Sequence, residues 1–452
     1  MEQEIRSWYS SSTTKPLLVQ GARRTGKTFT IERVGRELAG QGFVKLDFQA
    51  DLAAVERIFS GAHDNVDAIV ARISEYKRAD LFPESALIFL DEVQLHEKAL
   101  NSLRFFADSP WRVIASGSLL GVTTKRRKLP FPSGVRRVEM HPLDFEEFLW
   151  AVGEKHMAED IRNHFATLDP YVLHEQALEL LRRYYVVGGM PLPVRRWCET
   201  GDMGEVTGEH AEIDATYTAD MTDPENGISG VSAKRIWESL PRQLLRASTK
   251  KFKYSDVVRG GRRSRLLEPL EWLAAAGIVT IHERTSDLQA PLAPYNDEEG
   301  SYFKVYVADT GIMFRKFGID AQLVLDSDQR GLVSPEFRGA LAENYVMQAL
   351  HANGVASYYW MPEGSGARGE IDFMYQTSRA EVIPVEVKSA RNVAAKSLRR
   401  VVREGHSPYA IRLSENDFGR SFDEDGHELR SVPLYAAFCI GREASVSALP
   451  AR

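Results

Sequence analysis

Short apolar runs alternate with amphipathic stretches in the N-terminal part of the chain. The apolar runs, each of a length suited to a buried strand, are Leu17–Gln20, Gly42–Phe48, Ala86–Glu92 and Trp111–Ser116. Between them, Phe29–Leu38 and Val66–Tyr76 repeat apolar residues at helical spacing. Buried strands that alternate with helices predict an α/β fold with a parallel sheet.

The first apolar run leads directly into the pattern G-x-x-x-x-G-K-T. The residues of this pattern are Gly21, Ala22, Arg23, Arg24, Thr25, Gly26, Lys27 and Thr28. A strand before the pattern and a helix after it are the setting of a phosphate-binding loop, in which backbone N–H groups and the helix N-terminus face a polyphosphate. We therefore expect ATP at this loop, with Lys27 on the β- and γ-phosphates and Thr28 on Mg²⁺. The alternative is a chance match to the pattern in an ordinary loop.

Two carboxylates, Asp91 and Glu92, end the third apolar run. The carboxyl ends of parallel strands gather at one edge of a sheet, so Asp91 is expected to face the Mg²⁺ held by Thr28. Glu92 is expected to orient or deprotonate the attacking water, which favours hydrolysis over mere binding. The alternative is that the acidic pair only caps the strand and begins a turn.

The fourth apolar run ends in Ser116, which is expected either to contact the γ-phosphate or water or only to form a turn. A basic run, Lys125–Lys128, follows in a loop that Arg136 and Arg137 close. Such a run is usually a solvated face. One of these arginines is alternatively a finger for the ATP of a neighbouring subunit, which would make the protein a homo-oligomer.

A mainly helical pattern extends from Ala158 to about Leu245, and we assign it a structural role. From Lys234 to Arg265 the chain holds eleven basic residues against two acids, although its formal net charge is −6. A basic segment in an acidic chain indicates a polyanionic partner.

Helix, turn, helix and strand signals follow one another within and after this basic segment. Ile236–Arg246 and Tyr254–Val258 have helical patterns, Arg262–Ala276 predicts a longer helix, and Gly277–Ile281 predicts a strand. This order fits a winged helix-turn-helix. A recognition helix contacts DNA through its first residues, so the expected DNA-binding residues are Arg262, Arg263 and Arg265. The alternative is a solvated or nucleotide-facing basic surface within a packing domain, since winged helices often mediate protein contacts.

The C-terminal part carries a second group of acids. Glu343 lies in a predicted helix, Asp372 in one predicted strand, and Glu386 and Lys388 in another, where period-two alternation places both on one face. Clustered carboxylates are able to hold Mg²⁺ while Lys388 orients a water for attack on a phosphodiester, which predicts a metal-dependent nuclease site with Glu343, Asp372 and Glu386 as ligands. Charged residues on the exposed face of an ordinary strand are the alternative.

Composition limits the class of protein further. The fractions of hydrophobic residues, 43%, and of charged residues, 27%, are those of a globular protein. The sequence has no apolar run of membrane-spanning length and no signal-peptide core at Met1–Ser12, and two cysteines exclude a disulfide framework. We therefore expect a cytoplasmic protein without a membrane partner.

The same motifs resemble a prokaryotic family of AAA+-type ATP-binding proteins whose C-terminal domain of unknown function is similar to the PD-(D/E)XK nuclease superfamily. The matching segments are Gly21–Thr28, Phe89–Gln94, Ser116–Ser118, Pro142–Phe148, Gly188–Pro191, Tyr302–Gly311, Gly339–Asn344 and Pro384–Ser389. The superfamily motif falls on Glu343, Asp372, Glu386 and Lys388, with Ile371 where its name has proline. The resemblance implies an ATPase, a winged helix and a restriction-endonuclease-like domain, in that order.

The expected organisation has four parts. Residues 1–150 form a P-loop AAA+-type ATPase domain, 151–230 a helical region, 231–290 a winged helix and 291–452 a nuclease-like α/β domain. Two functions from different classes remain open. The first is an ATP-hydrolysing enzyme that acts on DNA through a Mg²⁺-dependent nuclease-like domain controlled by nucleotide state. The second is an ATP-dependent switch or scaffold that binds nucleic acid or a partner without cutting.

Overall fold

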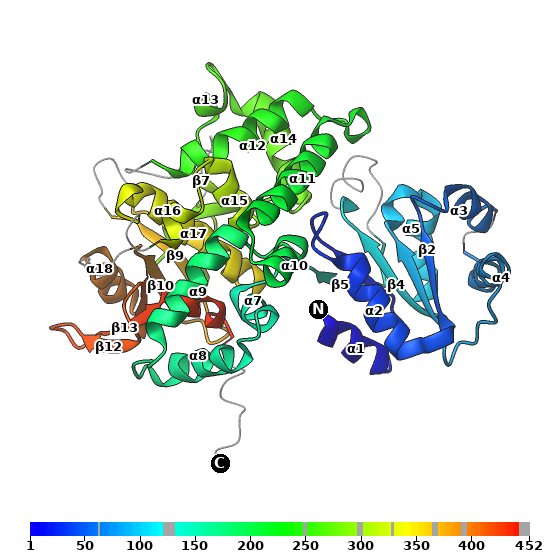
Figure 1. Cartoon of the computed structure of the whole chain (residues 1–452), viewed down its shortest axis with the longest axis horizontal. Coiled ribbons are helices and arrows are strands. Elements are labelled where there is room, and N and C mark those ends of the chain that lie inside the picture. Colours follow the sequence, from blue (N-terminus) through cyan, green and yellow to red (C-terminus); the bar gives the residue numbers. More distant parts are fainter. Residues whose placement is uncertain are drawn as a thin grey trace, which may run out of the picture. The chain divides into compact units, whose positions relative to one another are not determined.

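The computed structural model describes residues 1–61, 64–120, 132–246, 251–295, 302–326, 330–363, 369–389 and 396–442 (Figure 1). The chain divides into two compact units. Unit 1 comprises Met1–His141, Asp223–Ile228 and Glu271–Gly277, and unit 2 comprises Pro142–Thr222, Ser229–Leu270 and Ile278–Arg452. This division is coarser than the four expected parts, whose boundaries stay a prediction.

Unit 1 is built on a five-stranded sheet in which every pair of neighbours is parallel. The strands are β1 (Leu17–Gln20), β2 (Phe43–Asp47), β3 (Leu87–Asp91), β4 (Arg112–Gly117) and β5 (Arg136–Glu139), in the order β2-β3-β4-β1-β5. The predicted parallel sheet is confirmed, and the four apolar runs correspond to β1, β2, β3 and β4.

Strand β5 corrects one expectation, because Arg136 and Arg137 do not close a loop but begin this strand. It pairs with β1 alone, at the edge of the sheet, and its residues are half-buried and exposed in alternation. An edge strand with one half-solvated face needs no apolar run, so the hydrophobic pattern gave no signal. The basic run Lys125–Lys128 lies outside the described residues.

Helices cover both faces of the unit 1 sheet (Figure 1). On one face pack α1 (Glu2–Ser10) and α2 (Lys27–Ala39); on the other pack α3 (Leu52–Ile58), α4 (Val66–Lys77) and α5 (Glu97–Phe106). Short 3₁₀ helices are η1 (Gly40–Gly42), η2 (Val93–Leu95) and η3 (Pro224–Asn226). With both faces covered, the inner strands bury every apolar side chain, and the polar groups that matter gather where the strands end.

Unit 2 is rich in helices, as the pattern from Ala158 to Leu245 predicted. They are α7 (Phe145–Ala151), α8 (Lys155–Thr167), α9 (His174–Val187), α10 (Pro191–Thr200), α11 (Met203–Thr222), α12 (Gly230–Leu244), α13 (Tyr254–Val257), α14 (Arg263–Ala275, whose last residues belong to unit 1), α15 (Thr310–Phe317), α16 (Gln322–Leu325), η4 (Arg330–Leu332), α17 (Pro335–Ala352), α18 (Lys396–Gly405) and η5 (Leu434–Cys439).

An eight-stranded mixed sheet forms the centre of unit 2, in the order β12-β13-β11-β10-β9-β8-β6-β7. The strands are β6 (Val279–Thr285), β7 (Phe303–Val307), β8 (Ser357–Trp360), β9 (Ile371–Gln376), β10 (Val382–Val387), β11 (Tyr409–Ser414), β12 (Gly419–Phe422) and β13 (Glu428–Pro433). Strands β6 and β7 form an antiparallel pair after α14, and the end of β6 runs parallel to β8. The strand expected in the winged helix therefore also belongs to the larger sheet.

Two motifs that the sequence singled out without a role, Gly188–Pro191 and Val307–Gly311, meet in unit 2. The buried Asp309 carboxylate accepts hydrogen bonds from the backbone N–H of Gly189 at 2.6 Å and of Ile312 at 2.9 Å. Gly189 O in turn accepts from Leu143 N at 2.7 Å. Burial raises the pKa of Asp309 to about 6, although the backbone donors lower it. The Asp309 carboxylate thus joins the turn after α9 to the start of α15, and a backbone hydrogen bond joins the same turn to the segment before α7.

This close packing predicts a large effect of one methyl group. A Cβ on Gly189 would lie 2.0 Å from Leu143 O, so Gly189→Ala is expected to lower the free energy of unfolding by about 1–3 kcal/mol. The measurement is thermal unfolding of the full chain. The matched control is Gly208→Ala on α11, where a Cβ meets nothing within 4 Å and the exchange is expected to stabilise by about 0.5–1 kcal/mol. Equal melting temperatures for the two variants would contradict the packing argument.

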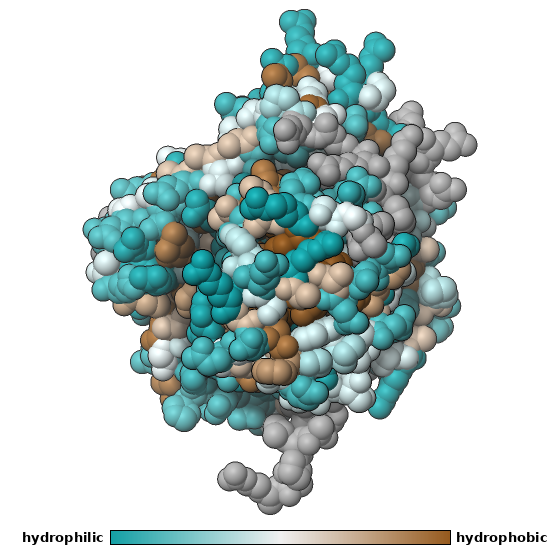
Figure 2. Space-filling model, turned by 90° about the vertical axis from the view of Figure 1, so that its right-hand side faces the viewer, coloured by the Kyte–Doolittle hydropathy of each residue, from teal (hydrophilic) through white to brown (hydrophobic). Residues whose placement is uncertain are grey.

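Large exposed hydrophobic side chains of unit 1 are dispersed over separate elements: Phe29 on α2, Leu52 on α3, Tyr76 on α4, and Phe82 and Leu95 in loops or short turns. In keeping with this, the face drawn in Figure 2 is mostly hydrophilic, with small separate hydrophobic areas. Among the residues that the structure describes, none of the helices has the length and apolar character needed to cross a bilayer.

Candidate functional site

The loop between β1 and α2 follows a tight path that its glycines permit. Gly21 has φ +148° and Gly26 has φ +89°, and Arg24 also lies in the left-handed region with φ 68°. A Cβ on Gly21 would lie 2.2 Å from Met140 O, so a larger residue does not fit there. The first turn of α2 begins at Lys27 directly after the loop. The predicted strand, loop and helix are all confirmed.

Lys27 is held inside this loop. Its side chain is 5% exposed, and Nζ donates hydrogen bonds to Gly21 O at 2.9 Å and Ala22 O at 2.7 Å. Burial lowers the pKa of Lys27 to about 8, against the opposing effect of the nearby Glu92 and Asp91 carboxylates. Among the described residues, the ammonium thus has these two backbone carbonyls as hydrogen-bond partners, which are weaker partners than an anion would be.

Thr28, Asp91 and Ser116 converge from three different elements. Thr28 Oγ1 donates to Asp91 Oδ1 and Oδ2 at 3.0 and 3.1 Å, and Ser116 Oγ donates to Asp91 Oδ1 at 2.5 Å. Thr28 comes from α2, Asp91 from the end of β3 and Ser116 from β4. The structure thus brings together the hydroxyl and carboxylate that the sequence expected to share a cation. Ser116 is more than a turn former, because its hydroxyl orients Asp91.

Glu92 lies beside this group in the left-handed backbone region, with φ 59° and ψ 45°. Its Oε2 accepts hydrogen bonds from Ser118 N at 3.2 Å, from Ser118 Oγ at 2.8 Å and from the Gln94 amide. A non-glycine residue in this conformation is strained and is usually kept where the side chain must point in one direction. The carboxylate is therefore fixed in place by Ser118, directly after β4, and by Gln94 on η2.

Lys45 on β2 also contacts Asp91, and the sequence gave no indication of it. Its Nζ lies 2.9 Å from Asp91 Oδ2 and 2.8 Å from Glu32 Oε1. Burial alone would lower the pKa of Lys45, but the hydrogen bonds with Glu32 and Asp91 raise it above its ordinary value. A lone lysine within a strand carries no motif, so only the register of β2 against β3 identifies it. Gln94 and Ser118 lay inside quoted motifs but had been assigned no role.

The second group of predicted residues gathers on β9, β10 and α17 in unit 2. Strands β9 and β10 are antiparallel, and Val385 pairs with Phe373. The next pair of facing residues is therefore Glu386 and Asp372. Lys388 Nζ lies 2.8 Å from Glu386 Oε1, and Asp372 Oδ2 accepts a hydrogen bond from Val387 N at 2.8 Å. Strand β10 is buried along its whole length, so these are not charges on an exposed strand face.

The electrostatics of this group favour an added positive charge. Burial raises the pKa of Asp372 to about 7, the Glu343 carboxylate adds to the rise, and Lys304 and Lys388 oppose it. Glu386 is 6% exposed, and among the described residues its Oε2 has no hydrogen-bond partner. An unpartnered oxygen of a buried carboxylate is costly unless a cation or a donor meets it.

Glu343, which acts electrostatically on Asp372, also has neighbours on β7. Tyr306 donates a hydrogen bond to Glu343 Oε2 at 3.2 Å, and Lys304 Nζ lies 3.9 Å from the same oxygen. Lys304 Nζ is closer to Glu370 Oε1, at 2.5 Å. Burial would lower the pKa of Lys304, but Tyr306 and the surrounding carboxylates raise it well above its ordinary value. Lys304 and Tyr306 stand in the matching segment Tyr302–Gly311, in which the sequence assigned neither of them a role.

The three arginines expected to meet DNA lie at the start of α14. Arg262, Arg263 and Arg265 are exposed, and Arg263 begins α14. Within the described parts of the chain, none of the three forms an ion pair, whereas several other arginines of unit 2 do. Helices α12, α13 and α14 and the β6–β7 pair follow in the order expected for a winged helix.

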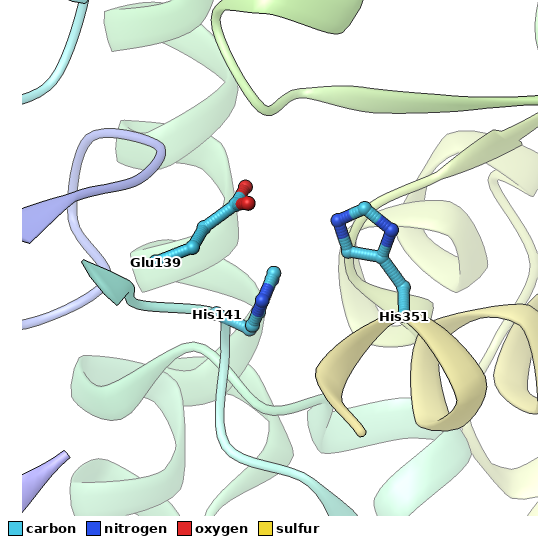
Figure 3. A group of neighbouring side chains, drawn as sticks. All are labelled: Glu139, His141 and His351. Atoms are coloured by element: carbon cyan, nitrogen blue, oxygen red, sulfur yellow. The ribbon is translucent and has the colours of Figure 1, made fainter. Parts of the chain in front are cut away.

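Figure 3 draws Glu139, His141 and His351. Glu139 and His141 belong to unit 1, at and after the end of β5, whereas His351 belongs to unit 2, in the last turn of α17.

Three family models match successive parts of the chain. Residues 13–149 match an AAA domain, residues 178–323 match a domain of unknown function (DUF8612), and residues 338–435 match another domain of unknown function (DUF4143). The match of residues 13–149 to an AAA domain agrees with the parallel sheet and the loop of unit 1. No curated protein matches the chain.

Solved structures similar to the chain include Cdc6p from Pyrobaculum aerophilum, at 15% identity over 62% of this chain and 86% of that one, with a TM-score of 0.25. AMPPCP-bound DnaA from Aquifex aeolicus has 15% identity over 60% and 85%, with a TM-score of 0.23. A complex of Thermococcus gammatolerans McrB AAA+ hexamers with bound McrC has 15% identity over 47% and 51%, with a TM-score of 0.20. TM-scores this low establish no shared fold over these lengths.

Proposed function

With the AAA domain at residues 13–149 as the premise, we propose that the chain binds and hydrolyses ATP with Mg²⁺. The observation that carries this proposal is the contact of the Thr28 hydroxyl with both oxygens of Asp91, at 3.0 and 3.1 Å, directly after the glycine-rich loop. A hydroxyl and a carboxylate oxygen at this spacing are the two protein ligands that Mg²⁺ takes in such sites.

Each residue of the site has a distinct part in this proposal. The loop from Gly21 to Gly26 turns its backbone toward the phosphates, and Lys27 exchanges its carbonyl partners for phosphate oxygens. Thr28 and Asp91 hold Mg²⁺, which supplies charge neutralisation at the phosphates when bound. Ser116 keeps Asp91 oriented, and Glu92, fixed by Ser118 and Gln94, accepts the proton of the attacking water.

We propose further that the chain acts on DNA, with α14 as the contact and the acids of β9 and β10 as a metal-dependent phosphodiester site. Exposed arginines without acidic partners support the contact. The unpartnered Oε2 of Glu386 and the raised pKa of Asp372 support a cation held by these two carboxylates. Lys388, 2.8 Å from Glu386, would hold the water or the developing charge.

An ATP-dependent switch or scaffold is the second candidate function. The ion pairs of Lys304 with Glu370 and Glu343 favour it, because they satisfy part of the acid cluster by an internal cation. In this case the C-terminal domain binds DNA or a partner and cuts nothing. Assembly of several copies, the cytoplasmic location and the roles of individual residues stay predictions.

The first prediction separates nucleotide binding from turnover. Lys27→Ala is expected to weaken ATP binding at least about tenfold, because the main side-chain charge opposite the phosphates is removed. Glu92→Gln is expected to keep ATP affinity and to lower turnover by about 10²-fold or more, because it keeps the shape and removes the base. Fluorescent-nucleotide titration and steady-state phosphate release measure the two. Wild-type turnover by Glu92→Gln would exclude Glu92 as the base.

The second prediction concerns α14. Reversal of Arg262, Arg263 and Arg265 to Glu is expected to weaken DNA binding and to flatten its salt dependence, by about 0.9 in the logarithmic slope for each phosphate that the variant no longer neutralises. The matched control reverses three other exposed cations, Lys98, Lys155 and Arg183. Binding isotherms on duplex DNA over a salt series give both slopes. If both triple variants behave alike, α14 does not bind the DNA.

The third prediction tests the acids of unit 2. Asp372→Asn and Glu386→Gln are expected to remove metal binding there, whereas Lys388→Met is expected to keep the metal and lower cleavage by about 10²-fold, because an ammonium is no metal ligand. Cleavage of single-stranded, duplex and branched DNA is measured with Mg²⁺ or Mn²⁺, with and without ATP. All three variants should hydrolyse ATP at nearly the wild-type rate, which is the control for folding. A wild type that cuts no DNA form would favour the switch.

A further inference from the structure

Lys304 is the least expected residue of the acid cluster. It comes from β7, which precedes the predicted metal ligands by a long stretch of chain, and its side chain is 1% exposed. Its ammonium lies 2.5 Å from Glu370 Oε1 and 3.9 Å from Glu343 Oε2, and 5.0 Å from the ring centre of Tyr359. Tyr306, on the same strand, donates to the same oxygen of Glu343.

Resting on the proposed phosphodiester site, we propose that Lys304 is the built-in cation of this cluster and limits it to one divalent metal ion. Lys304 forms an ion pair with Glu370 at 2.5 Å and lies 3.9 Å from Glu343, and we assign the metal ion to Asp372 and Glu386. Glu343 then supports the site through Lys304 and Tyr306 and is no ligand, which differs from the ligand set expected from the sequence.

The charges of the described side chains fit one divalent ion. The cluster contains four carboxylates, Glu343, Glu370, Asp372 and Glu386, and two ammonium groups, Lys304 and Lys388. When all six are ionised, two negative charges remain, which one divalent ion neutralises. A second divalent ion would leave two uncompensated positive charges in a buried place, where such an excess is strongly unfavourable.

The unpartnered atom lies where this assignment requires it. Glu343 Oε2 and Glu370 Oε1 both have the Lys304 ammonium within 4 Å. Glu386 is 6% exposed, and its Oε2 has no hydrogen-bond partner among the described residues. Lys304 is thus a positioning residue, which sets the number and place of metal ions without touching the substrate.

The test counts metal ions in the nucleotide-free full-length protein by electron paramagnetic resonance of free Mn²⁺, in an Asp91→Asn background that weakens the ATP-site metal. We expect one Mn²⁺ per chain, which no longer binds when Asp372→Asn is added. Adding Lys304→Met is expected to tighten Mn²⁺ binding at least about tenfold or to admit a second ion, because a neighbouring positive charge is removed. Mn²⁺ should then raise the melting temperature more than in the parent.

A charge-balanced variant guards against misfolding. Lys304→Met combined with Glu370→Gln removes both partners of the closest ion pair, which buried pairs tolerate better than the loss of one partner. It is expected to bind one Mn²⁺ with an affinity within about threefold of the parent. The role of Lys304, but not the metal site, would be overturned by either of two outcomes. The first is two Mn²⁺ ions bound by the parent. The second is a folded Lys304→Met protein that binds Mn²⁺ no more tightly than the parent and takes up no second ion. No Mn²⁺ bound by the parent would overturn the metal site itself, and this inference with it.

Discussion

Buried charge is the constraint on which both candidate sites depend. Lys27, Asp91, Lys304 and Glu386 are all less than a tenth exposed, and an ion in such a place must be met by hydrogen bonds or by opposite charge. In unit 1 the loop carbonyls meet Lys27, while Thr28, Ser116 and Lys45 meet Asp91. The sheet is what makes this possible, because its parallel strands deliver these groups to one edge from separate parts of the chain.

The two units stabilise their buried charges in different ways. The unit 1 site is assembled from backbone, hydroxyl and carboxylate groups at strand ends, with strain stored at Arg24 and Glu92. The unit 2 cluster is assembled on α17, on β9 and on the fully buried strands β7 and β10, and it uses lysines as internal counter-ions. Lysines fit this purpose because a flexible stem carries a compact charge into a narrow space. Asp309, by comparison, is a buried acid met by backbone donors alone and has a structural role.

Sequence patterns predicted those parts of the fold in which burial is regular. The four apolar runs were strands because both faces of the sheet are covered, and the loop was recognised because its glycines are required by its path. The partners of Asp91 and Glu343 were harder to predict from the sequence. Lys45 and Lys304 are single lysines in strands, and no periodicity tells which lysine turns inward. Strand β5 was missed because an edge strand tolerates charged residues, and its two arginines gave no apolar pattern.

The β6–β7 pair has a consequence for dissecting the protein. β7 has β6 as its one neighbour in the sheet, and β6 links that pair to β8. A fragment that begins at residue 291, where the nuclease-like part was expected to start, would keep Lys304 but lose β6. It would leave β7 without a pairing partner and open an edge of β8 along which other chains pair. Insolubility of such a fragment would then reflect where the chain was cut, and the unit is best studied with α12 to β6 attached.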